Sequence, residues 1–258
     1  MGQHPRHPTT DRTGVILAAG FGSRLQGVSS TTFLKPLTSV GGEPLLVRAI
    51  RSLEVAGCAR VVVVTGFGSG DVETQVRRLH QGPAELIFAE NPRYDLKNGV
   101  SVLAAAPHVP GEFVLMMADH VVDDDVMILA GSHAPVDEGA TLLVDYKLDT
   151  IFDMDDATKV LSDGDRIRAI GKQLTDFDCV DTGVFVCTRA LMAALERVFA
   201  AQGDASLSDG IQALADAGRM RLLDIGGGFW QDVDTPEMLA HAESVLSARQ
   251  QTARAAGI

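Results

Sequence analysis

Short apolar runs alternate with amphipathic segments over the first 120 residues of the chain. Four of these runs are apolar enough to form buried strands: 14–19, 60–66, 84–90 and 112–120. Three segments between them have the residue pattern of helices: 43–57, 71–81 and 98–109. Because strand and helix alternate at this pace, the pattern predicts right-handed βαβ units and a parallel sheet.

The pattern changes in the second half of the chain. Apolar runs with turns such as Asp163-Gly164 predict antiparallel or mixed strands at 140–146, 157–172 and 179–188. Three helices and a strand are expected after them, at 190–202, 207–217, 236–250 and 220–225 respectively. The acidic run 123–125 is interpreted as a solvated helix start.

Together these elements predict an α/β fold with a mixed, mostly parallel central sheet sandwiched by helices. No repeat or linker divides the chain, so one domain is expected over residues 13–250. The polar residues 1–12 are predicted to be a disordered tail, and residues 251–258 a C-terminal tail.

The charge balance excludes several classes of protein. The 258 residues carry a net charge of −12, which argues against sequence-independent nucleic-acid binding. An anionic substrate therefore needs a local cationic pocket or a metal ion. No apolar run is long enough to insert in a membrane. The three cysteines lack metal-site spacing, which favours reduced thiols in a cytoplasmic protein.

The loop after the first strand reads GVILAAGFGSRLQG, residues 14–27. A dinucleotide fingerprint needs glycine where Leu25 stands, and no Walker Gly-Lys-Ser/Thr follows. Backbone N–H groups of a glycine turn can still bind phosphate oxygens, with charge supplied by Arg24 and by Lys35 of the LKPL segment. The alternative is an ordinary strand-to-helix turn with exposed basic residues.

Two carboxylates are the candidate metal ligands. Asp119 ends the apolar run LMMADH, and Asp232 lies far downstream in FWQDVDTPE. Mg²⁺ prefers oxygen ligands and is commonly held by one or two carboxylates together with substrate phosphates. Asp234 has two interpretations, a functional carboxylate or the cap of the helix that starts at Thr235-Pro236.

Lysines are the third candidate group. Lys159 and Lys172 occur in strand or turn regions, and Asp181 follows them in FDCVDTG. A lysine on the side opposite the nucleotide would neutralise an attacking phosphate. Solvated surface charge is the alternative for both lysines.

Taken together, the motifs LAAGFGSRL, LKPL, LMMADH and FWQDVDT resemble the sugar nucleotidyltransferase family over about residues 13–245. The segments ATKV, GKQLTDFDCVDTGVFV, ADHV and WQDVDT resemble the CTP:inositol-1-phosphate cytidylyltransferases within it. The resemblance implies a Rossmann-like nucleotidyltransferase fold and Mg²⁺-dependent transfer of CMP from CTP to a small phosphorylated alcohol. Inositol 1-phosphate is the favoured acceptor, and CDP-inositol for phospholipid biosynthesis and pyrophosphate are the expected products.

The same resemblance assigns roles on the nucleotide side. Backbone contacts to base and ribose are expected from Leu17, Ala18, Ala19 and Gly20. Triphosphate contacts are expected from Gly22, Ser23, Arg24 and Lys35. The segment KNGVSV places Asn98 and Ser101 at the cytosine edge, and Asp119 and Asp232 hold Mg²⁺.

On the acceptor side the resemblance implies that Lys172, with Lys159, positions the attacking phosphate. Asp181 and Thr182 are expected near the inositol hydroxyls. His120 is assigned to the same side, with a structural role as its alternative. The residues expected to carry catalysis are therefore Arg24, Lys35, Asp119, Lys172 and Asp232.

Two other functions stay open at this point. One keeps the reaction but changes the acceptor to a sugar 1-phosphate, phosphocholine or 2-aminoethylphosphonate, or changes the nucleotide. The other is a non-catalytic regulator that binds nucleotide through the same fold. In the cytidylyltransferase reading, the expected partners are CTP, the phosphorylated alcohol and a downstream CDP-alcohol phosphotransferase.

Overall fold

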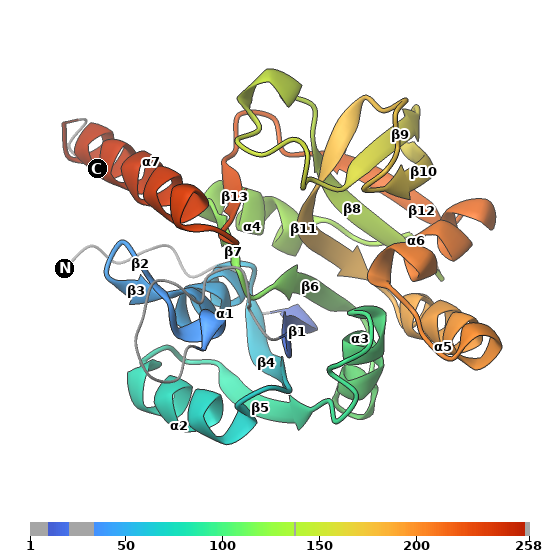
Figure 1. Ribbon diagram of the computed structural model, residues 1–258, viewed down its shortest axis with the longest axis horizontal. Helices are drawn as coiled ribbons and strands as arrows, with labels where there is room; N and C mark the ends of the chain where they lie inside the picture. The colour runs from blue at the N-terminus through green and yellow to red at the C-terminus, as the bar shows by residue number, and fades with distance from the viewer. Residues whose placement is uncertain (1–9, 21–33, 137, 256–258) are drawn as a thin grey trace.

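The computed structural model describes residues 10–20, 34–136 and 138–255. Within these residues nine strands form one sheet, in the order β5-β4-β1-β6-β11-β8-β12-β10-β9 (Figure 1). Their bounds are β1 (Thr10–Ala18), β4 (Cys58–Thr65), β5 (Glu85–Glu90), β6 (Phe113–Met117), β8 (Ala140–Asp145), β9 (Lys159–Asp163), β10 (Arg166–Gly171), β11 (Cys179–Cys187) and β12 (Met220–Asp224).

Parallel and antiparallel pairing divide the sheet into two halves. Strands β5, β4, β1 and β6 run parallel to one another, as the βαβ pattern predicts. β11 runs antiparallel to both β6 and β8, whereas β8 and β12 are parallel. β9 pairs with β10 and also with β11, so the second half of the sheet curls back on itself. The predicted mixed sheet of an α/β fold is confirmed.

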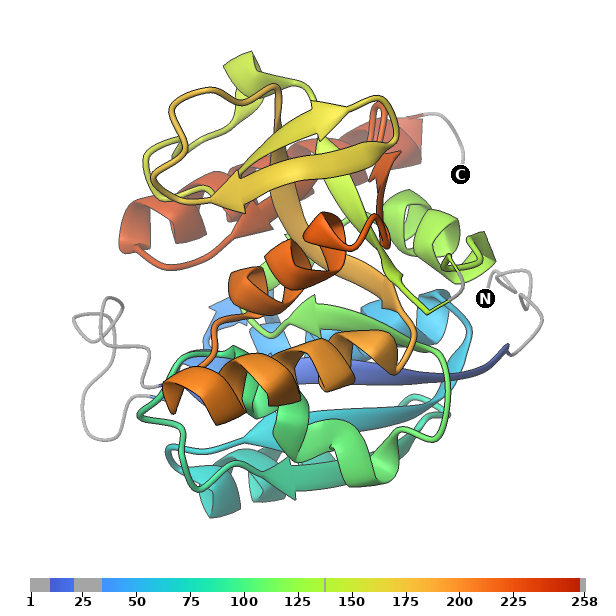
Figure 2. The same cartoon turned by 90° about the vertical axis from the view of Figure 1, so that its right-hand side faces the viewer.

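Helices cover both faces of this sheet (Figures 1 and 2). Their bounds are α1 (Leu45–Val55), α2 (Ser69–Leu79), α3 (Gly99–Ala105), α4 (Asp124–Ser132), α5 (Ala190–Gln202), α6 (Leu207–Asp216) and α7 (Pro236–Ala255). Short 3-10 turns stand at η2 (Lys35–Leu37), η3 (Ala106–His108) and η4 (Leu148–Thr150). Because α4 starts at Asp124, the acidic run 123–125 is a helix start, as expected.

Strand β1 shows how the sheet separates two cores. Val15 and Leu17 pack with buried residues of α3, α5 and α6 on one face. Ile16 and Ala18 pack with buried residues of α1, α2 and α4 on the other. Successive side chains of a strand point to opposite faces, so a continuous apolar run is what a sheet covered on both sides requires.

Two element boundaries differ from the sequence prediction. β1 begins at Thr10, inside the segment expected to be a tail, and α7 continues to Ala255 rather than ending at residue 250. Residues 237–255 contain neither glycine nor proline, so nothing in the sequence interrupts that helix. Although α7 has 20 residues, no helix in the described part of the chain has the length and apolarity needed to cross a membrane.

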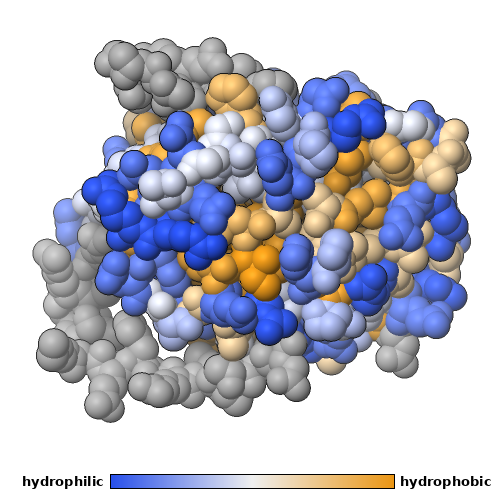
Figure 3. Space-filling view, turned by 90° about the horizontal axis from the view of Figure 1, so that it is seen from below, coloured by the Kyte–Doolittle hydropathy of each residue, from blue (hydrophilic) through white to orange (hydrophobic). Residues whose placement is uncertain are grey.

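Strand β5 forms one edge of the sheet. Its residues Leu86, Ile87 and Phe88 are half-buried, and Arg77 of α2 covers the ring of Phe88 at 4.7 Å from its centroid. Figure 3 views the molecule from below, the side on which β5 lies in Figure 1, and shows hydrophobic side chains gathered at the centre of this face among polar ones. The edge is therefore partly covered by long charged side chains, a common protection of exposed strands.

The packing of α4 against the end of α1 yields a stability prediction. A Cβ on Gly131 of α4 would lie 2.3 Å from the carbonyl oxygen of Ala56, which is backbone and cannot rotate away. Gly131→Ala is therefore expected to lower the free energy of unfolding by about 1–3 kcal/mol, measured by urea denaturation.

The matched control is Gly70→Ala in α2, where no atom lies within 4 Å of the added Cβ. This variant is expected to keep or slightly raise stability, because alanine favours helix over glycine. Equal stability of the two variants would contradict the close packing of α4 on α1.

Candidate active site

A cavity of about 260 Å³ opens where the two halves of the sheet meet. Asp119 lies two residues after the end of β6, His120 begins the short strand β7 (His120–Val122), and Asp232 ends the short strand β13 (Trp230–Asp232). The cavity thus lies beyond the carboxyl end of β6, the position at which open α/β sheets bind ligands. Its described lining includes Asn98, Asp119, His120, Asp156, Lys172, Asp181, Gly183, Trp230, Asp232 and Asp234.

Pairing of β7 with β13 brings distant parts of the chain together. The strands run antiparallel, with Asp232 opposite His120 and Trp230 opposite Val122. The carbonyl of Asp119 also accepts the N–H of Val233 at 2.9 Å. This ladder fixes Asp119 and Asp232, the two predicted metal ligands, beside the same cavity although 113 positions separate them in the sequence.

The side chain of Lys35 binds carboxylates from two segments of the chain that are distant in the sequence. It is the first residue of η2, where Pro36 follows it and the N–H of Leu37 donates to Leu34. Its ammonium group donates to Asp119 Oδ2 at 2.5 Å and also to Asp234. Burial opposes a charged lysine here, but the two carboxylates outweigh it and raise the pKa of Lys35 above its ordinary value.

Asp234 therefore has an observed partner. The open choice between helix cap and functional carboxylate is decided by geometry: the hydroxyl of Thr235 accepts the N–H of Met238 at 3.3 Å, which is the contact of a cap residue. Asp234 lies one residue earlier and forms an ion pair with Lys35. The carboxylate belongs to the charged group at the cavity and not to the helix cap.

Asp119 is the most strongly held acid of the cavity. Burial disfavours its charge, yet Lys35 and a 2.8 Å hydrogen bond with Nδ1 of His120 outweigh this cost and hold the pKa of Asp119 well below its usual range. The His120 ring stacks on Trp230, with centroids 5.9 Å apart and planes at 18°. Burial alone would lower the pKa of His120, but Asp119 and the other nearby carboxylates raise it.

Two other acids have raised pKa values. Burial raises the pKa of Asp181 to about 6, against one favourable hydrogen bond from the N–H of Gly183 at 2.7 Å. Burial and the neighbouring carboxylates of Asp119 and Asp234 also raise the pKa of Asp232. Ionising these two carboxyl groups is therefore costly, because burial removes them from water.

Asp156 is a site residue that the sequence reasoning missed. It forms an ion pair with Lys172 at 2.7 Å, and its oxygen lies within 4.8 Å of oxygens of Asp232 and Asp234. It stands in the acidic run MDDATKV, whose residues look alike in the sequence. The structure distinguishes them, because Asp156 lines the cavity whereas Asp155 is not among its described lining residues.

The donor set fits a hard divalent cation. Five carboxyl groups (Asp119, Asp156, Asp181, Asp232 and Asp234) line the cavity, and two ammonium groups, Lys35 and Lys172, pair with three of them. Carboxylate oxygens are the ligands preferred by Mg²⁺, and the surplus of negative charge suits a divalent ion. The residues present are therefore compatible with the predicted metal.

Other predicted residues occupy varied positions. Leu17, Ala18 and Ala19 are buried at the end of β1 and Gly20 is exposed, while Gly22, Ser23 and Arg24 lie outside the described residues. Asn98 lines the cavity, and its side-chain oxygen accepts the N–H of Leu207 at 2.9 Å.

The described lining of this cavity includes none of the predicted residues Leu17, Ala18, Ala19, Gly20, Lys35, Ser101, Lys159 and Thr182, and the last three have other partners. The Ser101 hydroxyl accepts a hydrogen bond from Asn91 at 3.0 Å. The Thr182 hydroxyl donates to the carbonyl of Leu143 at 2.8 Å, and the ammonium of Lys159 donates to the carbonyl of Asp155 at 2.9 Å. All three side chains are buried, so their polar atoms serve internal contacts.

Comparisons with known proteins agree on one kind of domain. A family model described as "MobA-like NTP transferase domain" matches residues 14–216. A curated protein of Rubrobacter xylanophilus, named "Bifunctional IPC transferase and DIPP synthase", is 36% identical over 94% of this chain and 54% of its own length. A protein of the same name from Aquifex aeolicus is 34% identical over 91% of this chain and 51% of its own length. The chain thus spans about half the length of these curated relatives.

A solved structure gives a comparison over a whole chain. The structure described as the inositol-1-phosphate CTP transferase from T. maritima superimposes with a TM-score of 0.79 at 28% identity. The match covers 92% of this chain and 98% of that one. The likeness therefore includes both the parallel and the antiparallel half of the sheet.

The raised pKa of Asp181 predicts a pH-dependent effect on stability. Because its folded-state pKa of about 6 lies above the ordinary value, the folded state gains less from ionisation than the unfolded state as pH rises. The wild type therefore loses stability from this group between about pH 4 and pH 6. Asp181→Asn keeps the acceptor for Gly183 and is expected to be more stable at pH 8, by up to about 3 kcal/mol.

The measurement is urea unfolding of both proteins at pH 4 and pH 8. The gain should be small at pH 4, where the carboxyl group is largely protonated in the folded state. The exposed residue Asp163, as Asp163→Asn, is the matched control and should show no such pH-dependent difference. A gain of the same size at both pH values would contradict the assignment.

Proposed function

Because the chain belongs to the MobA-like NTP transferase family, we propose that it is a cytidylyltransferase that transfers CMP from CTP to a small phosphorylated alcohol, with inositol 1-phosphate as the favoured acceptor. The observation that carries the proposal is the convergence of Asp119, Lys172 and Asp232 on one cavity, with Lys35 ion-paired to Asp119 of that lining. The names of the curated relatives and of the T. maritima neighbour support the nucleotide and the acceptor.

The reaction needs no nucleophile from the protein. An oxygen of the acceptor phosphate forms a bond with the α-phosphorus of CTP while the bond from that phosphorus to the pyrophosphate oxygen breaks. Because the acceptor phosphate is already anionic, no proton has to be removed from it. The protein then contributes alignment and charge neutralisation, which is consistent with a cavity of lysines and carboxylates.

The lysines divide between the two substrates in this proposal. Lys35 lies between Asp119 and Asp234 on the side of the first strands, where the glycine loop follows β1, and is assigned to the triphosphate. Lys172 follows β10 on the opposite half and is assigned to the acceptor phosphate. Asp181 and His120 line the same cavity and are assigned to the acceptor, whose hydroxyl groups can donate to a carboxylate.

Asp119 and Asp232 are proposed to hold Mg²⁺, and oxygens of Asp232, Asp156 and Asp234 lie within 4.8 Å of one another. When bound, the ion supplies positive charge that neutralises the phosphate oxygens and favours attack at phosphorus. Lys35 already compensates Asp119, so the protein keeps the Asp119 carboxylate ionised and in place before substrates arrive.

The finer points of the proposal follow from the relatives and from composition. The three cysteines are free and buried, which fits the reducing cytoplasm. CDP-inositol would feed a downstream CDP-alcohol phosphotransferase in phospholipid biosynthesis. Another acceptor or nucleotide, and a non-catalytic nucleotide-binding role, are the outcomes against which the proposal is tested.

The direct test is pyrophosphate release with Mg²⁺. CTP, UTP, GTP, ATP and dTTP are each combined with inositol 1-phosphate, glucose 1-phosphate, phosphocholine and 2-aminoethylphosphonate. The highest kcat/KM is expected for CTP with inositol 1-phosphate. Preference for another pair would keep the reaction and replace the substrate, while nucleotide binding by calorimetry without turnover across the panel would overturn the catalytic proposal.

Removal of the metal ligands should abolish turnover without unfolding the protein. Asp119→Asn and Asp232→Asn are each expected to lower kcat by about 10²–10³-fold, the size typical for loss of one group that stabilises transition-state charge. Circular dichroism checks the fold, and Asp163→Asn serves again as control. Near-normal kcat in both variants would exclude these residues from the metal site.

Lys172→Ala should act on the acceptor alone. A charge-assisted contact to phosphate contributes about 1.5–3 kcal/mol, so the KM for inositol 1-phosphate should rise by roughly 10- to 100-fold while the KM for CTP stays nearly constant. Lys97→Ala is the matched control because Lys97 is similarly exposed and does not line the described cavity. Equal changes in both KM values would contradict the assignment of Lys172.

A further inference from the structure

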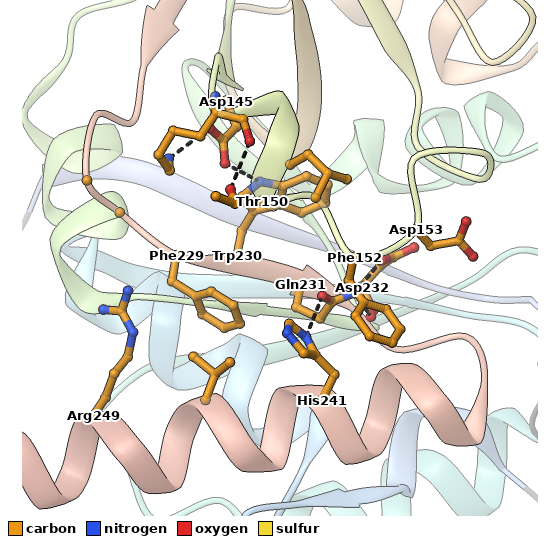
Figure 4. Close-up of a pocket in the computed structure, with 15 residues that line it drawn as sticks. Asp145, Thr150, Phe152, Asp153, Phe229, Trp230, Gln231, Asp232, His241 and Arg249 are labelled. Carbon is orange, nitrogen blue, oxygen red and sulfur yellow. Dashed lines mark hydrogen bonds and ion pairs between the residues drawn. The ribbon is translucent and has the colours of Figure 1, made fainter.

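A second cavity, of about 310 Å³, lies next to the first, and Figure 4 shows the residues that line it. Trp230 and Asp232 line both cavities. The indole ring therefore forms part of the wall between the candidate active site and a space bounded by α7 and the segment that includes η4. Trp230 is the single tryptophan of the chain.

The indole N–H points away from the first cavity, toward Asp145. Asp145 is the last residue of β8 and is only 3% exposed. Its Oδ2 accepts the N–H of Trp230 at 3.1 Å, as the dashed line in Figure 4 shows. Its Oδ1 accepts both the backbone N–H and the ammonium of Lys147, each at 2.8 Å. A buried carboxylate is costly unless hydrogen-bonded, and here both oxygens have donors.

On its other side the indole ring contacts the site through His120. The two rings are nearly parallel, at 18°, and the imidazole Nδ1 is 2.8 Å from Asp119 Oδ1. The far edge of the imidazole rests against Gly183, where an added Cβ would lie 2.6 Å from both Cδ2 and Nε2. His120 is thus confined between an indole face and a glycine backbone, and only the indole face is set by a movable side chain.

We propose that Asp145 is a positioning residue of this active site: by accepting the indole N–H of Trp230, it holds the stacked Trp230 and His120 rings so that His120 Nδ1 stays on Asp119. Nothing in the sequence motifs of the site includes Asp145, and the residue does not line the first cavity. Asp145 acts on the reaction indirectly, through the rings of Trp230 and His120 and the carboxylate of Asp119. The inference rests on the proposed function for its kinetic part only.

The hydrogen bonds of Asp145 distinguish this positioning role from a general contribution to the stability of β8. Lys147 already occupies Oδ1 together with a backbone N–H, and these contacts stay on the loop next to the strand. Oδ2 is the oxygen directed to Trp230. A residue that keeps this one acceptor but lacks the charge should preserve the position of the ring. A residue of similar size without the acceptor should not.

The kinetic test compares Asp145→Asn with Asp145→Leu. Asparagine can turn its single oxygen to the indole N–H, with its NH₂ group then facing Lys147, so its kcat should fall less than that of the leucine variant. Leucine removes the acceptor, and its kcat should fall about tenfold with little change in the KM for CTP, the size expected for one misplaced hydrogen bond. Asp224→Asn, at the end of the neighbouring strand β12, is the matched control and should behave as wild type.

Trp230→Phe tests the same hydrogen bond from its other end. Phenylalanine can stack on His120 but has no N–H to donate, so kcat should fall about as far as in Asp145→Leu. The double variant Asp145→Leu with Trp230→Phe should fall no further, because both changes remove one interaction. If Asp145→Leu does not fold, Trp230→Phe against Asp145→Asn decides the question.

A readout independent of turnover comes from the single tryptophan. In substrate-free protein the fluorescence anisotropy of Trp230 should fall in Asp145→Leu and stay at the wild-type value in Asp145→Asn and Asp224→Asn. This comparison tests the hydrogen bond even if the wild type does not use CTP and inositol 1-phosphate. Wild-type anisotropy and kcat in Asp145→Leu would overturn the proposal, as would an equal fall of kcat in the asparagine and leucine variants.

Discussion

The ammonium group of Lys35 is bound between two carboxylates that are far apart in the sequence. One belongs to Asp119, in the middle of the sequence after the central strand β6, and the other to Asp234, near the C-terminus just before α7. Removing a partner from a buried ion pair leaves an uncompensated charge, which costs far more than the pair itself contributes. The C-terminal segment therefore has to stay beside the first half of the sheet, and the β7–β13 ladder holds it in register there.

Local pattern was sufficient for the elements that surround this contact. Continuous apolar runs predicted β1, β4 and β5, because a strand covered on both faces needs apolar residues at every position. The pairing of β7 with β13 was not predictable in this way. Each has three residues, too few for any periodicity, and they pair only because β6 and the start of α7 bring them together.

Among the site residues, too, some were predictable from the sequence and others were not. Asp119 was predictable because a polar residue after a buried strand must emerge at the sheet edge, and Asp232 because of its motif. Asp156 and Asp145 were not predictable. Asp156 is one acid among several in its segment, and Asp145 is the last residue of an ordinary strand. Whether such a carboxylate faces a lysine, an indole or water depends on contacts with segments distant in the sequence.

The place of the acids in the sheet bears on the proposed chemistry. Asp119 stands where the parallel half, ending with β6, meets the antiparallel half, beginning with β11. The glycine loop follows β1 on one side of this boundary, whereas Asp181 and Lys172 belong to β11 and the end of β10 on the other. In-line displacement requires the attacking oxygen and the leaving pyrophosphate on opposite sides of the phosphorus. In the proposed assignment the triphosphate binds beside the first half of the sheet and the acceptor phosphate beside the second, so the carboxylates at the boundary lie between the two groups that the displacement separates.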